Sequence, residues 1–322
     1  MCVRNFVFMA LTYENTKNNE KRFLSLTSLK VLEFDFLLRH FEPISENYFR
    51  WHTLHGQLRV IPKYGIRSNE ALGSHCDKLF FLMVYLKNAP LQEFQGSNFG
   101  ISQGKVSRIV KILTDLLLKT LSKLKLTPCR SNEELQNVLE KHPDNTFSMD
   151  GTERRIARNL DYESQKELFS GKKKDHTVKN NIIFDDGSEV LFLSHTYEGK
   201  IHDKAICDED NYFFPKNTTL RVDLGYLAYK PDNVTIVIPV KKQKKIELSQ
   251  EIKDQNKLKS KERVVAEHGN SGIKRLRLLT DRLRLKLVEY QDSLMVVGCA
   301  LHNLRVRSPL RKYTSRKCTL AL

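Results

Sequence analysis

The second half of the chain alternates short β-rich apolar runs with helical segments, and this alternation most constrains the fold. Strands are predicted over 146–150, 177–184, 189–196, 219–223 and 234–239. The turn Asp185-Asp186-Gly187-Ser188 joins the second and third strands as a hairpin. Helices are predicted over 202–213, 247–275 and 289–305. Strands and helices in this order form a mixed sheet flanked by helices, so we expect an α/β domain.

Three acidic residues lie at informative places in this domain. Asp150 ends one apolar strand in SMDGTERR, and Asp223 ends another in LRVDLGY. Glu267 lies in the predicted basic helix, within VVAEHGNSGIKR. Ligand sites gather at strand ends, and adjacent carboxylates repel each other unless a cation lies between them. Each acid taken alone is more simply a surface carboxylate, but together they predict a site for Mg²⁺, which prefers oxygen ligands.

The charge balance points to the partner of such a site. Lys and Arg number 54 against 38 Asp and Glu, which gives a formal net charge of +16. This excess favours a nucleic-acid backbone as the partner, and a basic surface kept for solubility is the alternative. Two ions held by the three acids would suit phosphodiester cleavage. The six cysteines include no CxxC pair, which argues against a zinc ribbon, and no apolar run is long enough to span a bilayer.

The chain before this domain is predicted to be helical, with a helix-turn-helix at about 77–123. Leu91 to Asn98 forms a short helix, Gly100-Ile101 a tight turn, and Ser102 caps a helix that runs to about Lys123. This helix has a stripe of apolar residues at helical spacing. Its polar face is expected to meet base edges in the major groove through Gln103, Lys105, Ser107, Arg108 and Lys111. From this pattern alone, an ordinary helical hairpin with a solvated face is the alternative.

Further basic groups surround the three acids in the sequence. They are Arg154 after Asp150, the run Lys172, Lys173 and Lys174 before the hairpin, His202 beside Asp203, and Lys274 and Arg275 after Glu267. Beside a phosphoryl-transfer site, such groups are expected to bind DNA backbone without reading its sequence. Solvated loops, or a helix start in the case of His202, are the alternatives.

Several stretches, taken together, resemble bacterial insertion-sequence transposases of the DDE superfamily, in the group related to Harbinger-type elements. They are SMDGTERRIAR, KELFSGKKKDHTVKN, FLSHTYEGKIHDKAI, VDLGYLAY, VIPVKK, RVVAEHGNSGIKRLR and CALHNLRV. Their order is that of the family, and they span about Phe147 to Val306. The earlier stretches KLFFLMVYLKNAPLQEF and FGISQGKVSRIV resemble the family's helix-turn-helix region.

The resemblance implies a ribonuclease-H-like domain over 146–307, preceded by an all-α DNA-binding domain (1–127) and a hinge (128–145), and followed by a basic tail (308–322). It implies that Asp150, Asp223 and Glu267 are the catalytic and metal-binding triad, with two Mg²⁺ ions for which Mn²⁺ can substitute. The implied partner is double-stranded DNA, first at terminal inverted repeats that are nicked by hydrolysis, then at a target attacked by the freed 3′-hydroxyl. The implied form is a homodimer or larger assembly in the bacterial cytoplasm, at the nucleoid.

The chain departs from the family after Glu267. It reads His268-Gly269-Asn270-Ser271-Gly272, where relatives have better helix formers. Glycine in a helix interior costs roughly 1 kcal/mol relative to alanine, so we expect this helix to be loosened or kinked. Two other functions stay open: a helix-turn-helix DNA-binding protein whose nuclease domain is inactive or domesticated, and a ribonuclease-H-like enzyme that cuts RNA–DNA hybrids. The predicted DNA-reading helix argues against the second.

Overall fold

The computed structural model describes residues 11–65, 70–142, 144–241, 249–284 and 288–311. The chain divides into two compact units, the first formed by the helices up to Leu124 and the second beginning at Lys125. Most of the expected basic tail, 312–322, lies outside the described residues. No helix in the described part is both long and apolar enough to cross a membrane.

The first unit is built from helices, with α4 at its centre. It contains α1 (Glu14–Lys17), α2 (Glu20–Thr27), α3 (Val31–Trp51), α4 (His75–Asn88), α5 (Gln92–Phe99) and α6 (Gln103–Lys123). The run from Leu79 to Leu86 in α4 is buried throughout, as expected for a helix that is apolar on all sides. Phe23 of α2 and Phe34 of α3 meet Phe80 of α4 in an aromatic cluster.

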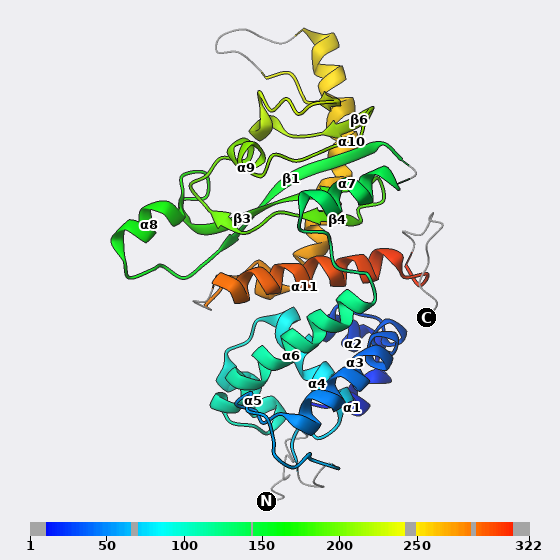
Figure 1. Cartoon of the computed structure of the whole chain (residues 1–322), viewed down its shortest axis with the longest axis vertical. Coiled ribbons are helices and arrows are strands. Elements are labelled where there is room, and N and C mark those ends of the chain that lie inside the picture. Colours follow the sequence, from blue (N-terminus) through cyan, green and yellow to red (C-terminus); the bar gives the residue numbers. More distant parts are fainter. Residues whose placement is uncertain (1–10, 66–69, 143, 242–248, 285–287, 312–322) are drawn as a thin grey trace, which may run out of the picture. The chain divides into compact units, whose positions relative to one another are not determined.

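The described part of the second unit contains a seven-stranded mixed sheet (Figure 1). Its strands are β1 (Thr146–Arg155), β2 (Phe169–Ser170), β3 (Asp175–Phe184), β4 (Val190–Leu193), β5 (Tyr197–Glu198), β6 (Thr218–Arg221) and β7 (Val234–Val237). The order is β2-β3-β1-β6-β7, and β4 and β5 also pair with β3. β1 is antiparallel to β3 and parallel to β6, and β6 is parallel to β7.

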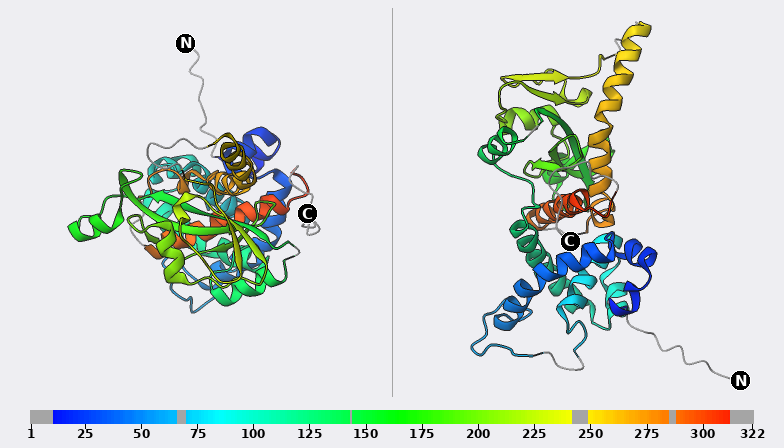
Figure 2. Two further views of the ribbon diagram at one scale, coloured as in Figure 1. Left: turned by 90° about the horizontal axis from the view of Figure 1, so that it is seen from above. Right: turned by 90° about the vertical axis from the view of Figure 1, so that its right-hand side faces the viewer.

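Helices cover both faces of this sheet, which confirms the predicted α/β fold class. They are α7 (Asn132–Glu140), α8 (Tyr162–Leu168), α9 (Asp203–Asp210), α10 (Gln250–Ile273) and α11 (Val288–Arg307), with the 3-10 turns η1 (Leu224–Tyr226) and η2 (Arg277–Leu279). One face packs into an apolar core with α7 and α9, to which β1 contributes Phe147 and Met149. Side chains alternate along a strand, so Ser148 and Asp150 point to the other face, along which α10 lies (Figure 2).

Glycines let α10 pack closely on its neighbours. A Cβ on Gly269 would lie 2.3 Å from the ring of Phe184 on β3, and a Cβ on Gly272 would lie 2.2 Å from the imidazole of His302 on α11. The helix nevertheless runs unbroken from Gln250 to Ile273. The expectation of a kink is therefore wrong. At Gly269 and Gly272 the helix loses helix propensity but gains close packing on β3 and α11.

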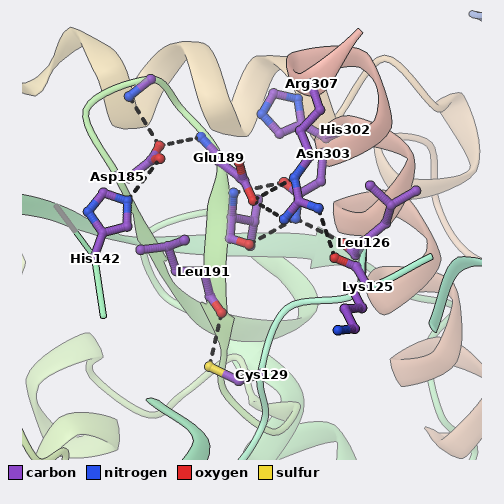
Figure 3. A network of polar contacts seen from close by, with 12 residues as sticks. Lys125, Leu126, Cys129, His142, Asp185, Glu189, Leu191, His302, Asn303 and Arg307 are labelled. Atoms are coloured by element: carbon purple, nitrogen blue, oxygen red, sulfur yellow. Dashed lines mark hydrogen bonds and ion pairs between the residues drawn. The ribbon is translucent and has the colours of Figure 1, made fainter. Parts of the chain in front are cut away.

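A buried polar network holds the start of the second unit against β4 and α11 (Figure 3). The Asn303 amide donates to the carbonyls of Leu126 and Val190, each at 2.9 Å, and accepts from the Val190 N–H at 2.8 Å. Arg307 contacts Glu189 and donates to the Lys125 carbonyl. These contacts satisfy backbone groups of β4 and of the entering segment that burial would otherwise leave unpaired.

The segment expected to be a hinge, 128–145, is instead packed into the second unit in its described part. Cys129 forms a parallel bridge beside Phe192 of β4. Leu135 and Leu139 of α7 are buried in the core of the sheet.

The strand β1 is longer than predicted. It extends past the predicted end at Asp150 to Arg155, because the polar residues Glu153 to Arg155 continue its pairing with β3. These residues form a strand because they pair with β3, and not because their own sequence is apolar.

We predict that Gly269→Ala destabilises the protein even though alanine is the better helix former. The new methyl group would meet the Phe184 ring, and overpacking of this kind costs about 1–3 kcal/mol. Urea unfolding followed by circular dichroism measures the change. Gly171→Ala is the matched control, because a Cβ there would meet open space. A Gly269→Ala protein as stable as the parent would contradict the close packing of α10 on β3.

Candidate active site

The pairing of β1 with β6 brings two of the predicted acids together. The parallel register matches Thr146 with Thr219 and Ser148 with Arg221. Continued two residues further, it sets Asp150 level with Asp223. Both residues follow core-facing neighbours, Met149 and Val222, so their side chains point to the face that carries α10. The fold thus places the two carboxylates level with each other, although Asp150 lies within β1 and not at its end.

The two carboxylates interact electrostatically. Burial, together with the negative charge of Asp223, raises the pKa of Asp150 to about 6. The Arg263 guanidinium and the hydrogen bonds from Asn270 and Gly151 act in the opposite direction and are not sufficient to cancel this shift. Asp223 Oδ1 accepts a 2.7 Å hydrogen bond from the Gly225 N–H, which fixes its side chain at the start of η1. A site of this kind favours a cation between the acids.

Glu267, the third predicted acid, lies on α10 at its exposed side. Its side chain is 57% exposed and forms a 3.1 Å ion pair with Arg263, one helical turn earlier. Asn270, one turn later on the same helix, donates to Asp150 Oδ2 at 2.7 Å. Within the described ranges, no three His, Cys, Asp or Glu side chains lie close enough to hold one metal ion. The described conformation therefore brings Asp150 within electrostatic range of Asp223 and pairs Glu267 with Arg263.

A further carboxylate, Asp203, lies beside the pair and was not among the predicted site residues. A Cβ built on Gly151 would lie 2.9 Å from the Asp203 carboxyl group. A Cβ built on Gly225 would lie 2.8 Å from Asp223 Oδ1 and 3.0 Å from Asp203 Oδ2, so both oxygens approach one point. Asp203 also pairs with the buried Lys179 at 3.2 Å. The pair His202-Asp203 in the sequence was the available signal, but it also fits a helix start, and α9 does begin there.

The donor set fits a hard divalent cation. Asp150 and Asp223 offer carboxylate oxygens to this region, and the Asn270 amide lies beside Asp150. Mg²⁺ prefers oxygen ligands of this kind. The Asn270 Oδ1 is buried and makes no hydrogen bond within the described part of the chain. Ser148 Oγ and Thr152 Oγ1, which flank Asp150 on the same face of β1, are buried without a partner in the same way. Buried polar atoms normally have partners, so this region suits bound water or an ion.

Basic groups contribute to the lining of a cavity of about 220 Å³ in the second unit. It is lined by Glu153, Arg155, Lys173, Thr177, Lys274, Leu279 and Thr280. Burial lowers the pKa of Lys274, while the charge of Asp150 acts in the opposite direction and Lys173 adds to the lowering. Lys274 thus presents positive charge within electrostatic range of Asp150, with Lys173 near it, as expected for groups that bind a phosphate.

The other basic residues predicted to bind DNA differ in their exposure. Lys172, Lys173 and Lys174 are exposed, and so are His202 and Arg275. Arg154 is wrong as a DNA contact in this structure, since it is only 2% exposed. Its Nη2 donates to Thr196 Oγ1 at 3.3 Å, and Asp292 of α11 interacts with it electrostatically. Side chains alternate between the two faces along β1, and this alternation points Arg154 inward. The dipeptide Arg154-Arg155 in the sequence does not indicate which of the two arginines is buried.

The predicted helix-turn-helix has the expected local structure in the first unit. Gly100 ends α5 with φ +67°, a left-handed value that glycine adopts readily, and Ser102 occupies the cap position of α6. Val106, Ile109 and Leu113 are buried on one side of α6. On the other side Gln103, Ser107, Arg108 and Lys111 are exposed, whereas Lys105 is half-buried and lines a separate cavity with Lys78.

Comparisons with known proteins agree with both parts of this description. Residues 149–303 match the family described as DDE superfamily endonuclease, and residues 71–123 match the family described as helix-turn-helix of DDE superfamily endonuclease. A protein named "Probable transposase for insertion sequence element IS702", from Microchaete diplosiphon, is 28% identical over 209 residues, which is 65% of this chain and 72% of that protein. No solved structure matches the chain significantly.

Without divalent ions at pH 7.5, we predict that Asp150→Asn stabilises the fold by about 1–3 kcal/mol. A carboxyl whose pKa is raised on folding opposes folding when charged, by roughly 1.4 kcal/mol per unit. The folded pKa is about 6, so the stabilisation is fully present above pH 6 and shrinks as the pH falls toward 4. Thermal unfolding at several pH values measures it. Asp232→Asn, at an exposed position, is the control. Equal stability of Asp150→Asn and the parent at pH 7.5 would contradict the unfavourable burial of the Asp150 charge beside Asp223.

Proposed function

We propose, from the premise that this chain belongs to the DDE superfamily of insertion-sequence transposases, that it binds the terminal inverted repeats of its own element, nicks them hydrolytically and transfers the freed strand. The observation that carries the proposal is the register of β1 and β6, which sets Asp150 beside Asp223 on the face along which Glu267 is carried by α10. Carboxylates brought together from parallel neighbouring strands suit the metal ions of a phosphoryl-transfer site.

Asp150, Asp223 and Glu267 would hold the metal ions. Two Mg²⁺ ions bound there, or Mn²⁺ in their place, would polarise the scissile phosphate and stabilise the charge on the attacking and leaving oxygens. For Glu267 to take part, its carboxylate has to leave Arg263, to which it is paired at 3.1 Å. Release from Arg263 would be easy, because rotations of exposed side chains are fast and an exposed ion pair is weak.

The chain's own cations would hold the DNA. Lys274, which interacts electrostatically with Asp150, and Lys173, which lines the same cavity, would bind phosphates on either side of the cleaved bond. Lys172, Lys174, His202 and Arg275 are exposed around it and would add contacts to the backbone. In the first step a water molecule attacks the phosphorus atom and the 3′-oxygen leaves. In the second, the freed 3′-hydroxyl attacks a phosphodiester of the target, so that one bond forms as another breaks.

Recognition of the ends would belong to α6. Gln103, Ser107, Arg108 and Lys111 form its exposed N-terminal face, which in a helix-turn-helix enters the major groove. Pairing of two ends would require a homodimer or larger assembly, with work at the nucleoid in the bacterial cytoplasm. This assembly and location are those that the family resemblance implies, and holding two DNA ends together is the physical reason for the assembly.

A second candidate function rests on the position of Glu267. Because its carboxylate pairs with Arg263 rather than with the two aspartates, the chain could be a helix-turn-helix DNA-binding protein whose nuclease domain has lost activity. This alternative predicts DNA binding that is independent of the acids and without cleavage in any metal ion.

We predict that the chain nicks a duplex carrying its element's ends in Mg²⁺, and that Asp150→Asn and Asp223→Asn each lower the rate by about 1000-fold or more, as loss of a central catalytic group does. Binding to the same duplex should be kept in both variants. Gel analysis of end-labelled DNA gives the rates, and a mobility shift gives the affinity. Asp232→Asn is expected to nick normally. If the parent binds the ends yet cleaves nothing in Mg²⁺ or Mn²⁺, the DNA-binding alternative is correct.

Arg108→Ala is expected to weaken binding to the element's ends by about 1–3 kcal/mol if Arg108 contacts a base edge. The loss should be smaller for duplexes of unrelated sequence. Lys119→Ala provides the control, because Lys119 is exposed near the opposite end of α6. Fluorescence anisotropy at two salt concentrations separates base contacts from backbone contacts. An equal loss on both kinds of duplex would assign Arg108 to the backbone instead.

A further inference from the structure

Asn270 occupies a place in the carboxylate site that no simple packing role accounts for. It lies on α10, one helical turn after Glu267, and is 8% exposed. Its Nδ2–H donates to Asp150 Oδ2 at 2.7 Å. The same amide's Oδ1 is buried and has no hydrogen-bond partner among the described residues. An unpaired buried carbonyl costs roughly 1–3 kcal/mol, so it needs a partner beyond those that the described residues supply.

The packing of α10 fixes the amide in this place. Gly269 lets the helix contact the Phe184 ring, and Gly272 lets it contact His302. Asn270 lies between these two contacts, so it has little freedom to move away from β1. Its donor side is occupied by Asp150, which leaves the acceptor side of the amide as the group without a partner. The nearby orphan oxygens of Ser148 and Thr152 show that this face of β1 is polar but incompletely paired.

We propose that Asn270 is a positioning residue of the metal site, which orients Asp150 through Nδ2–H and offers Oδ1 as a neutral oxygen to the divalent ion or to its bound water. This inference rests on the proposed function for the identity of the ion. A neutral amide suits the position because Asp150 and Asp223 already repel each other, and a third charge there would increase the repulsion. Residues that orient metal ligands typically change metal affinity about 10–100-fold when they are removed.

Binding of Mn²⁺ to the full chain tests the proposal without DNA and without activity. The electron paramagnetic resonance signal of free Mn²⁺ reports the fraction bound. Asn270→Ala is expected to weaken Mn²⁺ binding at least about tenfold. Ser271→Ala, at the adjacent exposed position of α10, should leave the affinity unchanged. An Asn270→Ala protein that binds Mn²⁺ within about twofold of the parent, or a parent that binds none, overturns the inference.

The isosteric change Asn270→Asp separates a metal role from a purely structural one and keeps the experiment informative if Asn270→Ala does not fold. It keeps the shape but replaces the donor to Asp150 by a third negative charge. We expect a lower melting temperature than the parent without metal, and a larger gain in melting temperature on adding Mn²⁺. If Asn270 only bridges α10 and β1, Mn²⁺ will not restore the loss, and the proposal fails.

Failure of the inference about Asn270 can be distinguished from failure of the proposed function. Nicking of element ends by the parent tests the function directly, whereas the Mn²⁺ affinities of the Asn270 variants test only the site. A parent that nicks DNA, together with an Asn270→Ala protein of unchanged affinity, keeps the function and removes the inference. A parent that binds Mn²⁺ more tightly than Asn270→Ala but nicks nothing keeps the inference about the site and removes the function.

Discussion

The parallel pairing of β1 with β6 is the interaction on which the rest of the site depends. A parallel ladder fixes which residues are neighbours, and here the register sets Asp150 level with Asp223. A slip of one residue would turn one of them into the apolar core that holds Met149 and Val222. The alternation that buries Phe147, Met149 and Leu220 on one face therefore also forces the two carboxylates onto the other. Core formation and placement of the acids are consequences of the same pattern.

The second constraint is the close approach of α10. Two glycines, Gly269 and Gly272, allow contacts with Phe184 and His302 that any side chain would block. The helix thereby brings Asn270 within 2.7 Å of Asp150 and carries Glu267 and Lys274 on either side of it in the sequence. Close packing limits how far α10 can move relative to β1. Changes at the carboxylate site therefore depend on movements of exposed side chains. The Arg263–Glu267 pair is of that kind, whereas Asn270 is buried.

The sequence predicted the α/β class, the hairpin of β3 and β4, and the helix-turn-helix geometry around Gly100, because each depends on local apolar periodicity or on turn residues. It also predicted that Asp150 and Asp223 would meet, although β1 continues past Asp150 and the parallel register with β6 is what brings the two residues level. The inward turn of Arg154, the packing of Cys129 beside β4 and the roles of Gly269 and Gly272 depend on contacts between distant segments. Local sequence carried no signal for these, and the glycines even suggested the opposite of what they do. Asn270 was noticed only as a poor helix former.

The central claim is that Asp150 and Asp223 share a divalent cation with α10 beside it. Backbone cleavage by bound Fe²⁺ tests this most directly, because Fe²⁺ placed in a Mg²⁺ site generates hydroxyl radicals that cut the polypeptide nearby. With ascorbate and peroxide, the full chain should be cut near Asp150, near Asp223 and between Glu267 and Asn270, and excess Mg²⁺ should suppress all three cuts together. Cuts at other positions, or cuts at these positions that Mg²⁺ does not suppress, would contradict the account.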